Sequence, residues 1–345
     1  MIKESVKKLT PYIPNTVPCT IKLDANEGSN YLFNEALDFR TEPLNLYPDS
    51  DALKLCNDLS QYLNVKPSQI MVGNGSSEMI ELLIKTYVEK DEIVLGFEPS
   101  FSMYQVYTTL HGGNYRTVSA EDDLSFSIER LITRAKQLKP KLIILCSPNN
   151  PTGFTFSKAA LEKVLKDTEA LVLIDEAYGE FSHQESVVSM VDTYPKLMVT
   201  RTFSKAFGLA GARLGYLISN SQRTSELRRV KTPYNLNRLS QYLGVSALKR
   251  IDDVSVYVDG VIQRRKKLQQ ALMELGFNVY PSEANFLFIK APIAQLYERL
   301  LENGILIRKF TGKWAQYYRI TVGLENQNET LISVLKGMIN DEKNA

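Results

Sequence analysis

The sequence of 345 residues contains few of the residues that build disulfide scaffolds or zinc sites. It has three cysteines, at positions 19, 56 and 146, and two histidines, and no two cysteines form a CxxC pair. An odd number of scattered cysteines argues against both a disulfide framework and a Cys/His zinc site. The pattern is typical of a reduced protein, and we expect a cytoplasmic location.

The sequence also lacks an excess of charge of one sign. Lys and Arg number 41, and Asp and Glu number 39, which leaves a formal net charge of +2. Nucleic-acid-binding surfaces need a strong basic bias, so we expect no nucleic-acid partner. No run approaches the roughly 18 apolar residues of a membrane span, and the charged first ten residues do not resemble a signal peptide. We therefore expect no membrane partner.

The length predicts roughly two domains at about 150 residues each. Short apolar runs alternate with amphipathic stretches (50–63, 77–88, 127–139 and 157–168), and several runs, such as LIILC and LVLI, are apolar throughout. Continuously apolar strands that alternate with helices favour a mostly parallel α/β sheet buried on both faces and flanked by helices. Seven strands are expected, at Ile70–Val72, Glu92–Phe97, Tyr115–Val118, Lys141–Cys146, Leu171–Asp175, Leu197–Thr200 and Gly215–Ser219.

The pattern changes after about residue 235. A long helical stretch, Ile251–Leu275, ends at Gly276, a residue suited to a helix C-terminus. Four more strands are expected, at 277–280, 284–290, 305–308 and 318–322, with helices near 293–302 and 329–339. We predict an N-terminal arm over residues 1–40, a large domain over 41–235 and a smaller C-terminal α/β domain over 236–345.

Polar loops follow several of the predicted strands, where open α/β sheets bind their ligands. GNGSSE (73–78) leads into a helix and can offer backbone N–H groups to an anion, although a plain tight turn explains it equally well. It has neither the GK[ST] of a P-loop nor the third glycine of the dinucleotide motif. SPNNPTG (147–153) is a rigid turn from which Asn150 can donate a hydrogen bond in a fixed direction, or merely a turn before the next helix.

Two further loops carry charged residues. Asp175 of DEAY ends a buried strand, where a carboxylate is costly unless it meets a cation or donors; a helix N-cap is the alternative. Lys205 of RTFSKAFGLAGARLGY (201–216) has apolar neighbours that would lower its pKa and make it a nucleophile for carbonyls, and Arg213 adds a phosphate-binding fork. Alone, each could be an ordinary surface cation. Together the four loops offer what pyridoxal phosphate requires.

The sequence resembles the histidinol-phosphate aminotransferase group of the fold-type I, pyridoxal-phosphate-dependent aminotransferases. The resemblance spans nearly the whole chain, and its specific part is the combination of SPNNPTG, DEAY and SKAFGLAG. Further matching segments are LTPY (9–12), DANE (24–27), LYPD (46–49), PSFSMY (99–104), IRK (307–309) and YRITVG (318–323). One departure is the segment at 26–29, which lacks the proline of the NENP that is common in the group.

The resemblance implies a role for each matched residue. Lys205 would form the imine with the cofactor aldehyde, Asp175 would pair with the pyridine nitrogen, and Phe101 would stack on the ring. Asn150 and Tyr178 would hydrogen-bond the ring oxygen. The cofactor phosphate would be held by Gly75, Ser76, Ser77, Thr202, Ser204 and Arg213, and by Tyr47 of the neighbouring subunit, which implies a homodimer with shared active sites.

The resemblance further implies a ping-pong aminotransferase of histidine biosynthesis. The amino donor would be L-histidinol phosphate and the acceptor a 2-oxo acid such as 2-oxoglutarate, with Arg308, Arg319, Tyr12 and Asn26 near the substrate. Three alternatives stay open: an aromatic or broad-range amino acid aminotransferase, a pyridoxal-phosphate-dependent decarboxylase of an O-phospho amino acid, and a non-catalytic binding protein with this fold. A nicotinamide dehydrogenase is disfavoured because no glycine triplet follows a predicted strand.

Overall fold

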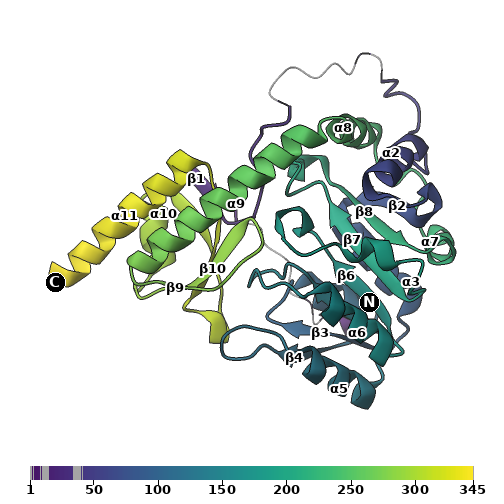
Figure 1. Cartoon of the computed structure of the whole chain (residues 1–345), viewed down its shortest axis with the longest axis horizontal. Helices are drawn as coiled ribbons and strands as arrows, with labels where there is room; N and C mark the ends of the chain where they lie inside the picture. The colour runs from purple at the N-terminus through teal and green to yellow at the C-terminus, as the bar shows by residue number, and fades with distance from the viewer. Residues whose placement is uncertain are drawn as a thin grey trace.

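Two β-sheets organise the chain (Figure 1). The computed structural model describes residues 2, 4–7, 9, 15–33, 40 and 42–344. The larger sheet has seven strands in the order β2-β8-β7-β6-β5-β3-β4, and the smaller has five in the order β1-β11-β12-β10-β9.

The large sheet contains the seven strands predicted from the sequence. Strands β3 to β7 are joined by parallel pairings, whereas β8 runs antiparallel to both β7 and β2. The predicted mostly parallel sheet is therefore confirmed. The strands are β2 (Ile70–Asn74), β3 (Ile93–Glu98), β4 (Asn114–Ser119), β5 (Leu142–Cys146), β6 (Leu171–Asp175), β7 (Leu197–Thr202) and β8 (Leu214–Ser219).

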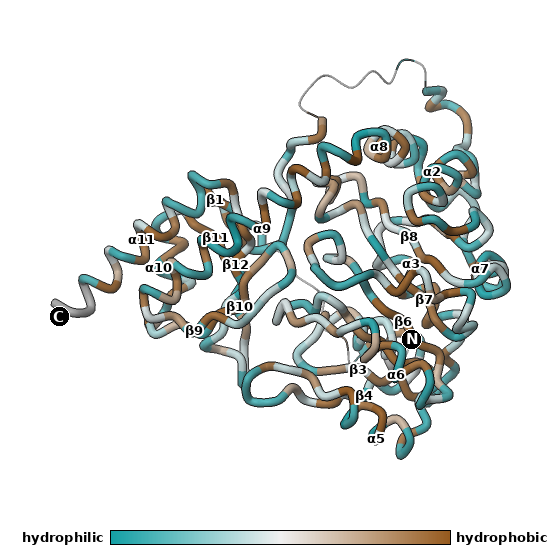
Figure 2. The backbone as a smooth tube through the Cα atoms, in the orientation of Figure 1, coloured by the Kyte–Doolittle hydropathy of each residue, from teal (hydrophilic) through white to brown (hydrophobic). Residues whose placement is uncertain are grey.

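The continuously apolar strands are explained by burial on both faces. In β5, Ile143 and Leu145 pack into one hydrophobic cluster, whereas Leu142, Ile144 and Cys146 pack into the cluster on the opposite face. Because successive side chains of a strand point to opposite faces, a sheet covered on both sides needs apolar residues at every position. Figure 2 shows the hydrophobic stretches of strands such as β6 and β7 in brown within the large unit.

Helices cover the large sheet, and two of them begin at a serine that caps the helix. The Ser127 hydroxyl accepts from the Arg130 N–H at the start of α5, and the Ser157 hydroxyl accepts from the Ala160 N–H at the start of α6. Helices α4, α7 and α8 were not predicted, since α4 is short and α7 is polar all round. The helices are α2 (Leu53–Leu63), α3 (Gly75–Tyr87), α4 (Met103–Leu110), α5 (Ile128–Leu138), α6 (Lys158–Asp167), α7 (Ser221–Arg228) and α8 (Arg238–Leu248).

The small sheet follows the long helix α9 (Ile251–Glu274), which ends before Gly276 in the left-handed conformation at φ 85°. Strand β10 runs antiparallel to β9 and β12, and β11 runs antiparallel to β12. Valines of α9 at 254, 258 and 261 join the core of the large sheet, so this helix connects the two units, as Figure 1 shows. The remaining elements are β9 (Asn278–Val279), β10 (Phe286–Lys290), α10 (Leu296–Glu302), β11 (Ile305–Lys309), β12 (Tyr317–Thr321) and α11 (Glu325–Asn344).

The N-terminal segment contributes structure that the sequence did not predict. After a short helix, α1 (Glu4–Lys7), the strand β1 (Ile21–Leu23) pairs in parallel with β11 at the edge of the small sheet. Helix α8 packs against α2 and β8 of the large unit. The division into an arm and two domains stays a prediction. No helix in the described part of the chain has the length and apolar character that a bilayer span needs.

Candidate active site

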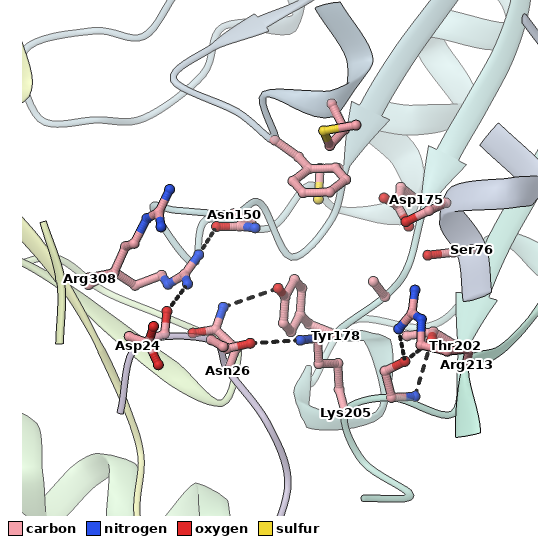
Figure 3. Close-up of a pocket in the computed structure, with 18 of the residues that line it drawn as sticks. Asp24, Asn26, Ser76, Asn150, Asp175, Tyr178, Thr202, Lys205, Arg213 and Arg308 are labelled. Atoms are coloured by element: carbon pink, nitrogen blue, oxygen red, sulfur yellow. Dashed lines mark hydrogen bonds between the residues drawn. The ribbon is translucent and has the colours of Figure 1, made fainter. Parts of the chain in front are cut away.

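A cavity of about 510 Å³ lies at the C-terminal ends of β5, β6 and β7 and extends to the small sheet (Figure 3). Most of the residues predicted for the site line it. They are Asn26, Ser76, Ser77, Phe101, Asn150, Asp175, Tyr178, Thr202, Ser204, Lys205, Arg213, Arg308 and Arg319. The folded chain therefore brings together residues that lie up to 293 positions apart in the sequence.

Asp175 is the last residue of β6 and is almost completely buried. The Tyr104 hydroxyl donates to its Oδ2 at 2.7 Å, and the Thr200 hydroxyl donates to its Oδ1 at 3.0 Å. Burial raises the pKa of Asp175, and these two hydrogen bonds oppose that rise. No α-helix begins at this residue, so Asp175 is not the helix cap that the sequence left as an alternative.

Lys205 follows β7 in a loop and reaches the cavity beside the N-terminal segment. Its Nζ donates to the Ala25 carbonyl oxygen at 3.0 Å and lies 5.8 Å from the centroid of the Tyr178 ring. Burial lowers the pKa of Lys205 to about 7, with the charge of Arg319 as the next cause. A substantial fraction of the amine is therefore neutral at neutral pH, and a neutral amine can attack a carbonyl carbon.

A group of donors suited to a phosphate lies near the start of α3. Gly75 opens that helix at φ 75°, a left-handed conformation that favours glycine, and a Cβ there would lie 2.7 Å from Nη2 of Arg213. The next amides, of Ser76 and Ser77, belong to the first turn of the helix, where N–H groups have no partner within the helix. Nη1 of Arg213 lies 3.5 Å from the Ser204 hydroxyl, to which Thr202 also donates.

The opposite side of the cavity carries two arginines from the small sheet. Arg308 on β11 and Arg319 on β12 lie directly opposite one another in the antiparallel register. Arg319 donates to the Asn150 Oδ1 at 2.6 Å and to the Asp24 carbonyl oxygen at 2.5 Å. In Figure 3, Arg308 and Asp24 lie on one side of the cavity, and Asp175, Ser76, Thr202 and Arg213 lie on the other.

Asn26 links the N-terminal segment to both sheets. Its Nδ2 donates to the Tyr178 hydroxyl at 3.1 Å, and its backbone N–H donates to the Thr321 hydroxyl at 3.0 Å. The Asn285 side chain in turn donates to the Asn26 carbonyl oxygen at 3.1 Å. This segment therefore forms one wall of the cavity, and the place of Asn26 beside the substrate stays a prediction.

Two of the predicted residues that the structure describes, Gly75 and Tyr47, do not line the cavity. Gly75 opens α3 beside Arg213, as described above. Tyr47 is 78% exposed and stacks on Tyr234, with 4.5 Å between the ring centroids. Tyr12 lies outside the described residues.

Other residues of the site were missed by the sequence analysis. Asp24, Ala25, Met103, Tyr107, Cys146 and Ala177 also line the cavity. The contact of Tyr104 with Asp175 was missed as well, because it joins residues 71 positions apart in the sequence. Across the residues that the structure describes, no group of three or more His, Cys, Asp or Glu side chains could hold a metal ion.

Comparison with known proteins identifies the family. The family model described as aminotransferase class I and II matches residues 21–335. The chain belongs to this family. The histidinol-phosphate aminotransferase of Caldanaerobacter subterraneus subsp. tengcongensis is 37% identical over 98% of this chain and 99% of its own length. That of Clostridium novyi is 36% identical over 98% and 97%. The predicted resemblance is confirmed.

Solved structures of aminotransferases share the fold. The histidinol-phosphate aminotransferase of Clostridium acetobutylicum superposes with a TM-score of 0.86 at 27% identity and covers 93% of this chain and 99% of its own. That of Sinorhizobium meliloti, solved in complex with pyridoxal 5′-phosphate, gives a TM-score of 0.89 at 21% identity over 99% and 98%. The predicted fold class is therefore confirmed along nearly the whole aminotransferase chain.

Proposed function

We propose that this aminotransferase uses pyridoxal phosphate and takes L-histidinol phosphate as its amino donor, with a 2-oxo acid such as 2-oxoglutarate as acceptor. This reaction would place it in histidine biosynthesis, in the cytoplasm. Family membership and the names of the full-length relatives support the reaction. The residues of the cavity support the cofactor, because a buried amine, a strand-end carboxylate and a set of phosphate donors meet there.

When bound, pyridoxal phosphate supplies an electrophilic aldehyde and a ring that withdraws electrons from the substrate Cα. Lys205 has the properties of the residue that holds the aldehyde and then moves the Cα proton, since a pKa of about 7 lets its amine both take up and release a proton near neutral pH. Asp175 would hold the proton on the ring nitrogen, because a buried carboxylate favours a nearby cation.

The other predicted cofactor contacts fit the same placement. Asn150 accepts from Arg319 through its Oδ1, which leaves its Nδ2 to donate to the ring oxygen beside Tyr178. The first-turn amides of α3, Ser204 and Arg213 would hold the phosphate, and Phe101 would cover the ring. The close approach of Gly75 to Arg213 supports this assignment, because it keeps a cation and free amide donors next to each other.

The pair of arginines is the observation that carries the substrate assignment. Like charges directly opposite one another in an antiparallel pair destabilise a sheet, yet Arg308 and Arg319 occupy such positions and both line the cavity. An anionic group between them would offset the repulsion, and arginine forks bind phosphate in two-point contacts. The phosphate of histidinol phosphate would supply that group.

An exposed apolar surface supports the proposed homodimer. Large apolar side chains before and at the start of α2, and one in the loop before α8, are 47–78% exposed: Leu44, Leu46, Tyr47, Leu53 and Tyr234. An apolar surface of this kind is expected to be covered by a partner. Light scattering is expected to give the mass of two chains, and Tyr47→Ala is expected to weaken pyridoxal phosphate binding, because Tyr47 would contact the cofactor phosphate of the other subunit.

A panel of amino donors tests the reaction. The purified chain is loaded with pyridoxal phosphate and mixed with histidinol phosphate, phenylalanine or tyrosine, and the absorbance of the bound cofactor is followed. Fast conversion to the amine form by histidinol phosphate alone is the expected result. Faster conversion by the aromatic amino acids would instead favour an aromatic aminotransferase.

The same experiment tests the remaining alternatives. Release of carbon dioxide from an O-phospho amino acid, with no amine form of the cofactor, would indicate a decarboxylase. Purified protein that takes up no pyridoxal phosphate would indicate a non-catalytic protein and would overturn the proposal.

A further inference from the structure

Tyr104 is a completely buried titratable residue to which the proposed function so far gives no role. It lies in the first turn of α4, and its hydroxyl donates to Oδ2 of Asp175 at 2.7 Å. We infer that Tyr104 is a positioning residue for Asp175, which keeps the carboxylate ionised and fixed in orientation at the end of β6. The inference rests on the proposed function, because the role requires a cofactor ring nitrogen that pairs with Asp175.

The surroundings of Asp175 explain why such a donor is needed. Burial disfavours the charged carboxylate, and the neighbouring Glu176 acts in the same direction, so both raise the pKa of Asp175. Hydrogen bonds from Tyr104, from Thr200 on β7 and from the Ala177 backbone favour the charged form. The Cys146 thiol, opposite Asp175 on β5, is held neutral because burial raises its pKa. These donors therefore oppose the effects of burial and of Glu176, which disfavour the charged carboxylate.

The geometry also suits a fixed orientation. Tyr104 binds one carboxylate oxygen and Thr200 binds the other, so the plane of the carboxylate cannot rotate without breaking a hydrogen bond. Burial raises the pKa of Tyr104 well above 10, so its phenol remains a proton donor at every working pH. Its ring also packs edge-on against Phe101, with 5.4 Å between centroids. Phe101, just before α4, would cover the cofactor ring, and Tyr104, in the first turn of α4, holds the carboxylate of Asp175.

Removal of the single hydroxyl tests the inference. Tyr104→Phe removes a hydrogen bond to a charged group, and such bonds are stronger than those between neutral groups. The variant should therefore bind pyridoxal phosphate about 10- to 100-fold more weakly. The matched control is Tyr216→Phe, since Tyr216 is also completely buried and its hydroxyl has no hydrogen-bond partner among the described residues. Affinity for the cofactor, measured by fluorescence titration of the unloaded chain, should be unchanged in the control. The affinity for pyridoxal phosphate should decline at low pH, where Asp175 becomes protonated. The pH of this decline should be about one unit higher in Tyr104→Phe and unchanged in the control.

A double-mutant cycle separates positioning from a general packing effect. In an Asp175→Asn background, Tyr104→Phe should change the affinity for pyridoxal phosphate less than about twofold, because the carboxylate through which it acts is gone. Equal losses in both backgrounds, or no loss in the wild-type background, would overturn the inference while leaving the proposed function intact. If the wild-type chain binds no pyridoxal phosphate, the proposed function fails, and the inference fails with it.

Discussion

The two sheets contribute different parts of the same site. The large sheet provides the residues proposed to bind the cofactor, from the segments that follow several of its strands and from the last residue of β6. The small sheet provides Arg308 and Arg319 from neighbouring antiparallel strands. The comparison leads to the prediction that one sheet carries the chemistry and the other recognises the substrate.

The two parts also differ in how they are assembled. In a parallel sheet the carboxyl ends of the strands meet at one edge, so the order of the loops in the sequence already brings their residues together. The substrate side instead joins β11 and β12 to a segment near residue 25 that passes across the cavity. Substitutions on the two sides should therefore have separable effects on turnover, stability and substrate affinity.

Lys205→Ala should have the largest effect, and it tests the chemical role of the large sheet. Loss of the amine removes both the nucleophile and the proton carrier, so turnover should fall by about 10³-fold or more. Pyridoxal phosphate should still bind, but sodium borohydride should no longer fix it to the chain. Lys163→Ala is the control, since Lys163 lies on the exposed face of α6 and pairs with Asp167. Full turnover in Lys205→Ala would refute the assignment.

Arg201→Met should have the next largest effect, and it acts on the stability of the large sheet. The Arg201 guanidinium lies 3.1 Å from Glu180 and 3.7 Å from Glu176, and all three side chains are less than 10% exposed. Removal of the cation leaves two buried carboxylates without their partner, which should cost about 3–5 kcal/mol of unfolding free energy. Urea unfolding of the cofactor-free chain measures the loss.

The control for this stability effect is Lys163→Met, which breaks an exposed ion pair and should change the unfolding free energy by less than about 0.5 kcal/mol. Similar losses in the two variants would mean that the Arg201 cluster is not a buried structural element of the large sheet.

Arg308→Met tests the small sheet. Loss of one guanidinium group removes a charge-assisted hydrogen bond, so the KM for histidinol phosphate should rise about 10- to 100-fold. The affinity for pyridoxal phosphate should stay the same. Steady-state kinetics and cofactor titration give the two quantities. The neighbouring Lys309→Met is the control, since Lys309 is exposed and pairs with Glu298. An equal loss of cofactor affinity in Arg308→Met would contradict the division between the sheets.

The sequence could predict the features that have a local pattern, and it missed those that depend on distant contacts. The seven strands and the strand-end residue Asp175 follow from local patterns. A strand that is buried on both faces needs an uninterrupted run of apolar residues, and a polar residue marks the end of that run. Four of the five strands of the small sheet were also predicted, namely β9 to β12. The strand β1 was missed because three residues beside an irregular segment give no periodicity, and its partner β11 lies about 280 residues away.

The roles of individual residues were less accessible to local patterns. Tyr104 was missed because its contact with Asp175 spans 71 residues and depends on how α4 packs on the sheet. The placement of Arg319 against Asn150 likewise depends on a tertiary contact between the two units, which no local pattern encodes. Resemblance to a family, rather than spacing, suggested that the two arginines belong to the site.

The pH dependence of cofactor capture should show the smallest effect, and it connects the two sheets. The capture rate of pyridoxal phosphate by the unloaded chain should follow the neutral fraction of Lys205, which increases with pH, so the rate should rise about tenfold from pH 6 to 8 and then level off. Stopped-flow absorbance measures this rate. A rate that keeps rising to pH 10 would mean that the amine keeps its ordinary pKa.

Arg319 is a cause of the lowered pKa of Lys205 that comes from the small sheet, whereas Arg308 is not among the causes. Arg319→Met should therefore move the midpoint of the rate profile to higher pH, and Arg308→Met should leave it unchanged. The sign follows from Coulomb repulsion, since removal of a nearby cation makes the ammonium form easier to hold. Identical midpoints in the two variants would mean that the charge of Arg319 does not contribute to the lowered pKa of Lys205.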